Sequence, residues 1–66
     1  MWIGDMVKVL NVNEVLPHER KVAEVMVGNY FMIEDLNHTL AFFTITDSYH
    51  KKCVIAIPLK NLVKGE

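Results

Sequence analysis

The residues of this chain that could do chemistry are few and scattered. His50 and Cys53 stand three positions apart, and the other two histidines, His18 and His38, lie in earlier polar stretches. A structural zinc ion normally takes four nitrogen or sulfur ligands, whereas this chain offers one sulfur and three dispersed imidazoles. The sequence therefore predicts neither a metal site nor a cofactor.

Two pairings that catalysis would use also fail on geometry. Residues three apart on a strand point to opposite faces, so the His50 imidazole and the Cys53 thiol would not meet as base and nucleophile. Glu34 and Asp35 are adjacent and also project to opposite sides of a strand, whereas paired acid–base carboxylates must share a site. We therefore expect solvated turn histidines, a cysteine in the core and a protein that is not an enzyme.

One polar turn combines basic side chains with an aromatic ring, as nucleic-acid surfaces do. The formal net charge is −1 at pH 7, and acidic and basic residues are interspersed along the chain, whereas phosphate binding normally needs a basic stripe. A module that binds RNA or DNA is therefore the alternative and not the favoured interpretation. Its candidate contacts are Tyr49, His50, Lys51 and Lys52 on that turn, with Arg20 and Lys21 from an earlier segment.

The elements that must position these residues are β-strands. Pro58 has no N–H for a sheet ladder and ends a β-branched run. Gly28 and Asn29 favour a tight hairpin turn. We expect a single 3₁₀ turn over Pro58–Leu62 and a terminal edge strand beginning at Val63. The five strands predicted before that turn are Asp5–Val12, Val22–Val27, Tyr30–Glu34, Leu40–Thr46 and Lys52–Ile57.

The stretch 13–26 leaves one alternative open. Its residues have reasonable helix propensity, and Val22, Val25 and Met26 match one helical face. Pro17 would suit the first turn of such a helix. A β-branched run directly before a Gly-Asn pair is a hairpin signal, however, and favours the strand.

Length and cysteine content set further limits. The 66 residues make one domain, residues 1–66, and a chain this short buries only about 60% of the surface that its unfolded form exposes. Cys53 is the single cysteine, so no intrachain disulfide is available and a reducing, cytoplasmic setting is expected. No segment approaches the roughly 20 apolar residues that a membrane-spanning helix needs. The start of the chain also lacks the basic and apolar regions of a signal peptide.

The apolar fraction of 52% is high for so short a chain. Within Leu40–Thr46, for example, Leu40 and Phe42 make a second face apolar. Small monomers seldom expose a large apolar patch without a reason, so we favour a partner surface, which a second copy would cover in a homodimer. A tight barrel that buries both faces of its strands is the alternative. The candidate protein-binding residues, several of them adaptable methionines, are Met6, Met26, Met32, Leu40 and Phe42.

Several motifs follow one another in a familiar order. They are a Gly4-Asp5-x-Val7-x-Val9 opening, a Pro-containing loop, a Val-Ala-Glu-Val strand, and a final Ile-Ala-Ile-Pro-Leu-x-x-Leu-Val. This order resembles the SH3-like barrels over about Gly4 to Lys64. It is similar to the small KOW-type domains of transcription and translation, and to small uncharacterised bacterial families of that fold. The resemblance implies a small, five-stranded, all-β barrel with a 3₁₀ turn before the last strand.

We therefore predict a non-enzymatic domain that acts by binding. By analogy with its class, it is a small bacterial, phage or plasmid accessory protein that binds or inhibits a protein partner. An oligomer that sequesters a small nucleotide-like ligand between protomers is a further alternative. The predicted core is Val7, Val9, Ala23, Val25, Ile33, Phe43, Ile45, Ile55, Ile57 and Leu62.

Overall fold

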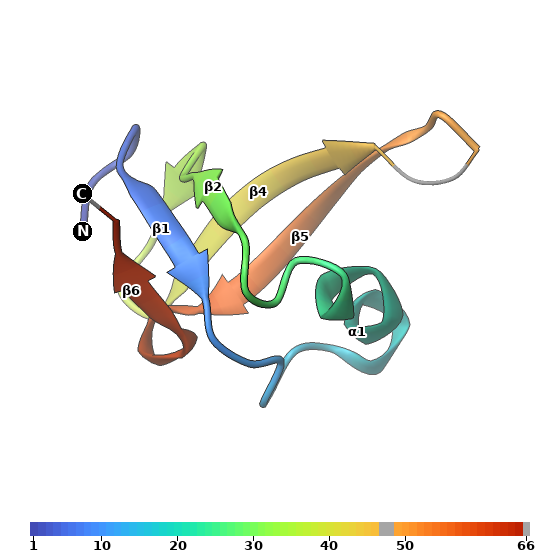
Figure 1. Cartoon of the computed structure of the whole chain (residues 1–66), viewed down its shortest axis with the longest axis horizontal. Helices are drawn as coiled ribbons and strands as arrows, with labels where there is room; N and C mark the ends of the chain where they lie inside the picture. The colour runs from blue at the N-terminus through green and yellow to red at the C-terminus, as the bar shows by residue number, and fades with distance from the viewer. Residues whose placement is uncertain (47–48, 66) are drawn as a thin grey trace.

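The computed structural model describes residues 1–46 and 49–65 and has a mainly β fold with two small antiparallel sheets and one short helix (Figure 1). The strands are β1 (Met6–Val9), β2 (Tyr30–Met32), β3 (Asp35–Leu36), β4 (Leu40–Thr46), β5 (Lys52–Pro58) and β6 (Leu62–Lys64), the helix is α1 (Pro17–Glu24), and η1 (Leu59–Asn61) is a 3₁₀ turn. One sheet has the strand order β2-β1-β6 and the other the order β3-β4-β5. The β4–β5 hairpin extends away from the first sheet, and α1 lies beside β5 (Figure 1).

The prediction of an all-β, five-stranded barrel is therefore correct only in its mainly β character. The two sheets do not close into a barrel, and a helix joins the strands. The strand predicted over Leu40–Thr46 and the 3₁₀ turn after Pro58 are confirmed. Both β1 and β2 are shorter than predicted, and Asp35–Leu36, which lies between two of the predicted strands, forms β3.

The chain passes from one sheet to the other between Ile33 and Glu34. The Ile33 N–H donates to the Asp5 carbonyl (2.9 Å), and the Ile33 carbonyl accepts the Gly4 N–H (2.8 Å), so Ile33 extends the pairing of β2 with β1. The next residue, Glu34, donates its N–H to the Phe42 carbonyl in the second sheet (3.0 Å). Because the Ile33 side chain is fully buried, the crossing point also belongs to the core.

Two glutamates cover backbone groups at strand edges. The Glu34 carboxylate accepts the Thr44 N–H on β4. Thr44 lies beyond the residues of β4 that pair with β3. Glu19 of α1 accepts the Ala56 N–H on β5 (3.0 Å), and the Glu19 side chain is only 16% exposed. Open N–H groups at a sheet edge are templates for pairing with another chain, so each carboxylate closes one such position.

The strand predicted over Val22–Val27 is wrong, and the helical alternative is the one that forms. The helix begins at Pro17, whose fixed φ and missing N–H suit the first helical position. Strand alternation would have placed Val25 on the same face as Ala23, whereas helical spacing brings Met26 beside Ala23. Ala23 and Met26 are buried accordingly, while Val25 is 72% exposed.

The core draws on both sheets and on α1. Phe43 is almost fully buried and meets Phe31 edge to face, with ring centroids 6.3 Å apart. Of the predicted core residues, Val25 is exposed, so this assignment is wrong, and Ile45 is partly buried and packs against the core. Val15, Met26 and Ala41 are buried in the core in addition to the predicted residues. The predicted core residues that are confirmed are Val7, Val9, Ala23, Ile33, Phe43, Ile55, Ile57 and Leu62.

Replacing Phe43 by alanine should unfold most of the protein. Truncating a buried phenylalanine costs about 3–5 kcal/mol, and a domain of this size has a total stability of about 5 kcal/mol. Val25→Ala is the matched control, because truncating so exposed a side chain should change the free energy of unfolding by less than about 0.5 kcal/mol. Thermal melts followed by circular dichroism make the comparison. A Phe43→Ala protein that melts like the wild type would contradict this core.

Glu19→Ala should lower the free energy of unfolding by about 1–3 kcal/mol, because the Ala56 N–H loses a charged, partly buried acceptor. Glu24→Ala is the control on the same helix, since the Glu24 side chain is exposed. Urea unfolding gives both values. Hydrogen exchange at the Ala56 amide should accelerate in Glu19→Ala alone, and equal exchange in the two variants would show that Glu19 does not protect this edge.

Candidate protein-binding surface

One face of the β2-β1-β6 sheet points away from the core and is largely apolar. Side chains alternate along β1, so its inward residues are buried while Met6 and Lys8 point outward. The register pairs Met6 with Met32. Lys8 lies between Tyr30 on β2 and Val63 on β6. We call this outward-pointing set the outer sheet face: Met6, Lys8, Leu10, Tyr30, Met32 and Val63.

The apolar side chains of the outer sheet face are about half exposed. Their exposed fractions range from 45% to 54%. All members of the face except Met32 line a shallow hollow of about 630 Å³, together with Lys64 and Gly65. Apolar side chains gathered on one face in this way are typical of interaction sites, whereas exposed apolar residues scattered singly are normal.

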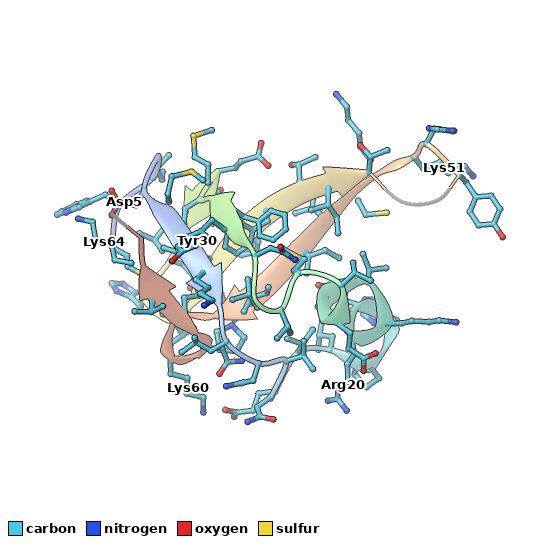
Figure 2. All side chains as sticks on the ribbon, viewed as in Figure 1. Asp5, Arg20, Tyr30, Lys51, Lys60 and Lys64 are labelled. Atoms are coloured by element: carbon cyan, nitrogen blue, oxygen red, sulfur yellow. The ribbon has the colours of Figure 1, made fainter. Side chains whose placement is uncertain are left out.

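Two lysines, one of them paired with a carboxylate, lie at this apolar surface. The Lys8 Nζ atom lies 6.0 Å from the centroid of the Tyr30 ring, at the outer limit of a cation–π contact. Lys64 Nζ is 3.7 Å from an Asp5 carboxylate oxygen, and the same oxygen accepts the Trp2 N–H (2.9 Å). Figure 2 shows Asp5, Tyr30 and Lys64 on the same side of the molecule, opposite the tip of the β4–β5 hairpin. The Asp5 carboxylate is thus already engaged at the end of the sheet.

The structure separates the five predicted protein-binding residues. Met6 and Met32 lie on the outer sheet face. Met26 is 1% exposed, so its assignment to a binding surface is wrong. Leu40 and Phe42 are half-buried on β4, in the other sheet. The predicted set therefore does not form one surface.

Sequence reasoning did not assign Tyr30, Leu10 or Val63 to a binding surface. The alternation that places Leu10 on the same side as Met6 is visible in the sequence. The neighbours of β1 are not, because β2 and β6 reach it from distant parts of the chain. The face becomes recognisable only when the sheet order is known.

The predicted nucleic-acid residues fall in two separate places. Residues 49–52 are exposed at the start of β5 and directly before it, and positions 47 and 48 lie outside the described residues. Arg20 and Lys21 lie on α1 instead. Figure 2 shows Lys51 at the hairpin tip, well apart from Arg20. The Arg20 Nη2 atom donates to the Val15 carbonyl (3.1 Å). These basic residues do not form one continuous patch.

The residues considered for catalysis and metal binding have separate surroundings. Cys53 is half-buried on β5, and His50 occupies the turn before it with a φ of 62°. Residues 1–46 and 49–65 contain no group of three or more His, Cys, Asp or Glu side chains that could hold a metal ion. Glu34 and Asp35 each accept a backbone N–H from a strand residue. In the part of the chain that the structure describes, no helix has the length and apolar character needed to cross a membrane.

Comparisons of this chain with protein-family models, with curated proteins and with solved structures find no match. The case for a function therefore rests on the surfaces described above.

We expect no binding of duplex or single-stranded nucleic acid at physiological salt. The basic residues are divided between the hairpin tip and α1, and the formal net charge is −1. Fluorescence anisotropy with labelled random-sequence DNA and RNA, repeated at several salt concentrations, measures this directly. Low-micromolar binding that falls steeply with salt, and that the Lys51→Glu/Lys52→Glu double variant loses, would support the RNA- or DNA-binding alternative.

Proposed function

We propose that this chain is a non-enzymatic binding module that holds a protein partner on its outer sheet face. The observation that carries the proposal is the group of apolar side chains, 45–54% exposed, on one sheet of a very small domain. Burying apolar surface contributes about 25 cal/mol per Å². A partner that covers this face would bury apolar area that the isolated chain leaves exposed to water, and this burial would stabilise the complex.

The outer sheet face is not needed to hold the domain together. The core is completed by the opposite side of the same sheet, where Val7, Val9 and Leu62 are buried. A face without a structural role would normally carry polar side chains in an antiparallel sheet. The apolar character of this face therefore favours contact with another molecule, as in a binding module.

The connectivity supports an SH3-like fold as part of the same proposal. One segment, from Tyr30 to Leu36, serves both sheets as β2 and β3, and η1 directly precedes the last strand. That last strand, β6, returns to pair with β1. A 3₁₀ turn before the last strand is what the resemblance implies. We propose an SH3-like fold from this connectivity.

The wider setting follows from the class of molecule. We propose a cytoplasmic accessory protein of bacterial or phage type that binds or inhibits its partner. A half-buried, single Cys53 suits a reducing compartment. The homodimer and the oligomer that sequesters a nucleotide-like ligand stay predictions, and RNA or DNA binding stays the runner-up.

Met32→Glu should abolish capture of the protein partner, because it places a charge in the outer sheet face without touching the core. Val54→Glu is the matched control, since Val54 is 63% exposed on β5, in the other sheet. Tagged full-length chains are incubated with nuclease-treated native lysate, and captured proteins are compared by quantitative mass spectrometry. We expect one set of proteins that the wild type and Val54→Glu retain and Met32→Glu loses.

Thermal melts show whether Met32→Glu and Val54→Glu remain folded, which the comparison of captured proteins requires. Both substitutions are at exposed positions and should change the free energy of unfolding by no more than about 0.5 kcal/mol. A partner retained equally by folded Met32→Glu would place the binding site elsewhere. A partner lost on nuclease treatment would point to nucleic acid instead.

A further inference from the structure

Lys8 stands in the middle of the outer sheet face, and its charge is not balanced there. Tyr30 and Val63 flank it in the sheet register. Among the described residues, no carboxylate forms an ion pair with Lys8. Lys64 lines the same hollow but is paired with Asp5. The hollow therefore has an excess of positive charge within an apolar surround.

A protein that covers this face must remove the Lys8 ammonium from water. Burial of an unpaired charge is strongly unfavourable unless an opposite charge and hydrogen-bond acceptors replace the lost water. The nearest side chains of the face do not supply that opposite charge, because neither Tyr30 nor Val63, which flank Lys8, carries a carboxylate. The covering surface must therefore bring a carboxylate to Lys8 and apolar side chains to its neighbours.

A second copy of this chain meets this requirement less well than a different protein. In a two-fold dimer each patch faces the same patch of its partner, so an axis through the centre of the face would bring the two copies of Lys8 together. Like charges brought together at an interface are costly. Asp5, at the end of the sheet, is already held by Lys64 and by the Trp2 N–H.

We infer that the outer sheet face binds a short peptide segment of a partner protein, in which an aspartate or glutamate is flanked by apolar residues. This inference rests on the proposed function and adds the chemistry of the partner. The carboxylate pairs with Lys8, and the apolar residues contact Met6, Tyr30 and Val63 and extend over Met32, which the register pairs with Met6. The hollow of about 630 Å³ lies within the range of about 300–1,000 Å³ typical of ligand sites, which suits a few side chains.

Selection from a phage-displayed library of short random peptides tests the inference on the full chain. The immobilised proteins are the wild type, Lys8→Glu, and Lys51→Glu, which makes the same charge change at the distant hairpin tip. We expect the wild type and Lys51→Glu to enrich acidic residues within apolar sequences, and Lys8→Glu to enrich basic ones. A synthetic peptide from the wild-type selection should bind Lys8→Gln at least about tenfold more weakly, as expected when one member of a desolvated charge pair is removed.

The remaining outcomes separate this inference from the proposed function. Apolar peptides without an acidic preference, enriched equally by the wild type and Lys8→Glu but lost by Met32→Glu, would overturn the inference and leave the binding face in place. Peptides that bind Met32→Glu as well as the wild type would count against the face itself. The absence of any enriched peptide would overturn the inference, as would a homodimer in sedimentation that Met32→Glu dissociates. Circular dichroism verifies folding, and Lys8→Gln carries the comparison if Lys8→Glu does not fold.

Discussion

The arrangement of this small protein depends on the transfer of one chain segment between two sheets at Ile33 and Glu34. A sheet of three strands needs a buried apolar face to be stable, and here each sheet acquires that face because the other lies against the same core. The backbone of Ile33 continues the pairing with β1, and that of Glu34 begins the pairing with β4. The side chains divide in the same way, since Ile33 is fully buried and Glu34 reaches the Thr44 N–H. A polar residue at position 33 would disrupt core and crossing together.

Because the sheets do not close, their edges must be protected by other means, and this requirement explains the position of α1. Glu19, Ala23 and Met26 are spaced so that they share one side of the helix and the turn that ends it. Ala23 and Met26 are buried in the core, while Glu19 accepts the Ala56 N–H at the edge of β5. One helical face thus contributes to packing and to edge protection. A strand at the same place would have divided these three residues between two faces.

The features that the sequence predicts well are those set by local chemistry. The run of aromatic and β-branched residues in β4 and the stop at Pro58 are examples, and both appear in the structure where expected. The helix was missed as the favoured interpretation because Val22–Val27 has the composition of a strand, and tertiary contacts of Glu19 and Met26 decide against that local preference. The candidate surface was predicted in part. Met6 was assigned correctly to the exposed side of its strand, but the order β2-β1-β6 is a long-range property that no local pattern contains.

The alternation of side chains along β1 places Val7 and Val9 in the core, and it also determines where Lys8 lies on the outer sheet face. The period of two along β1 means that a register shift of one residue would bury Lys8 and expose Val7 and Val9, so the packing of these valines holds Lys8 outward. Tyr30 and Val63 then flank it through pairing on both sides of β1. A sheet face needed only for solubility would carry several charges and few large apolar groups. Under the binding function that we propose, a single central ammonium within apolar neighbours would serve discrimination, because apolar contact would supply affinity for many proteins and a charge that becomes buried on binding would reject those without a matching carboxylate.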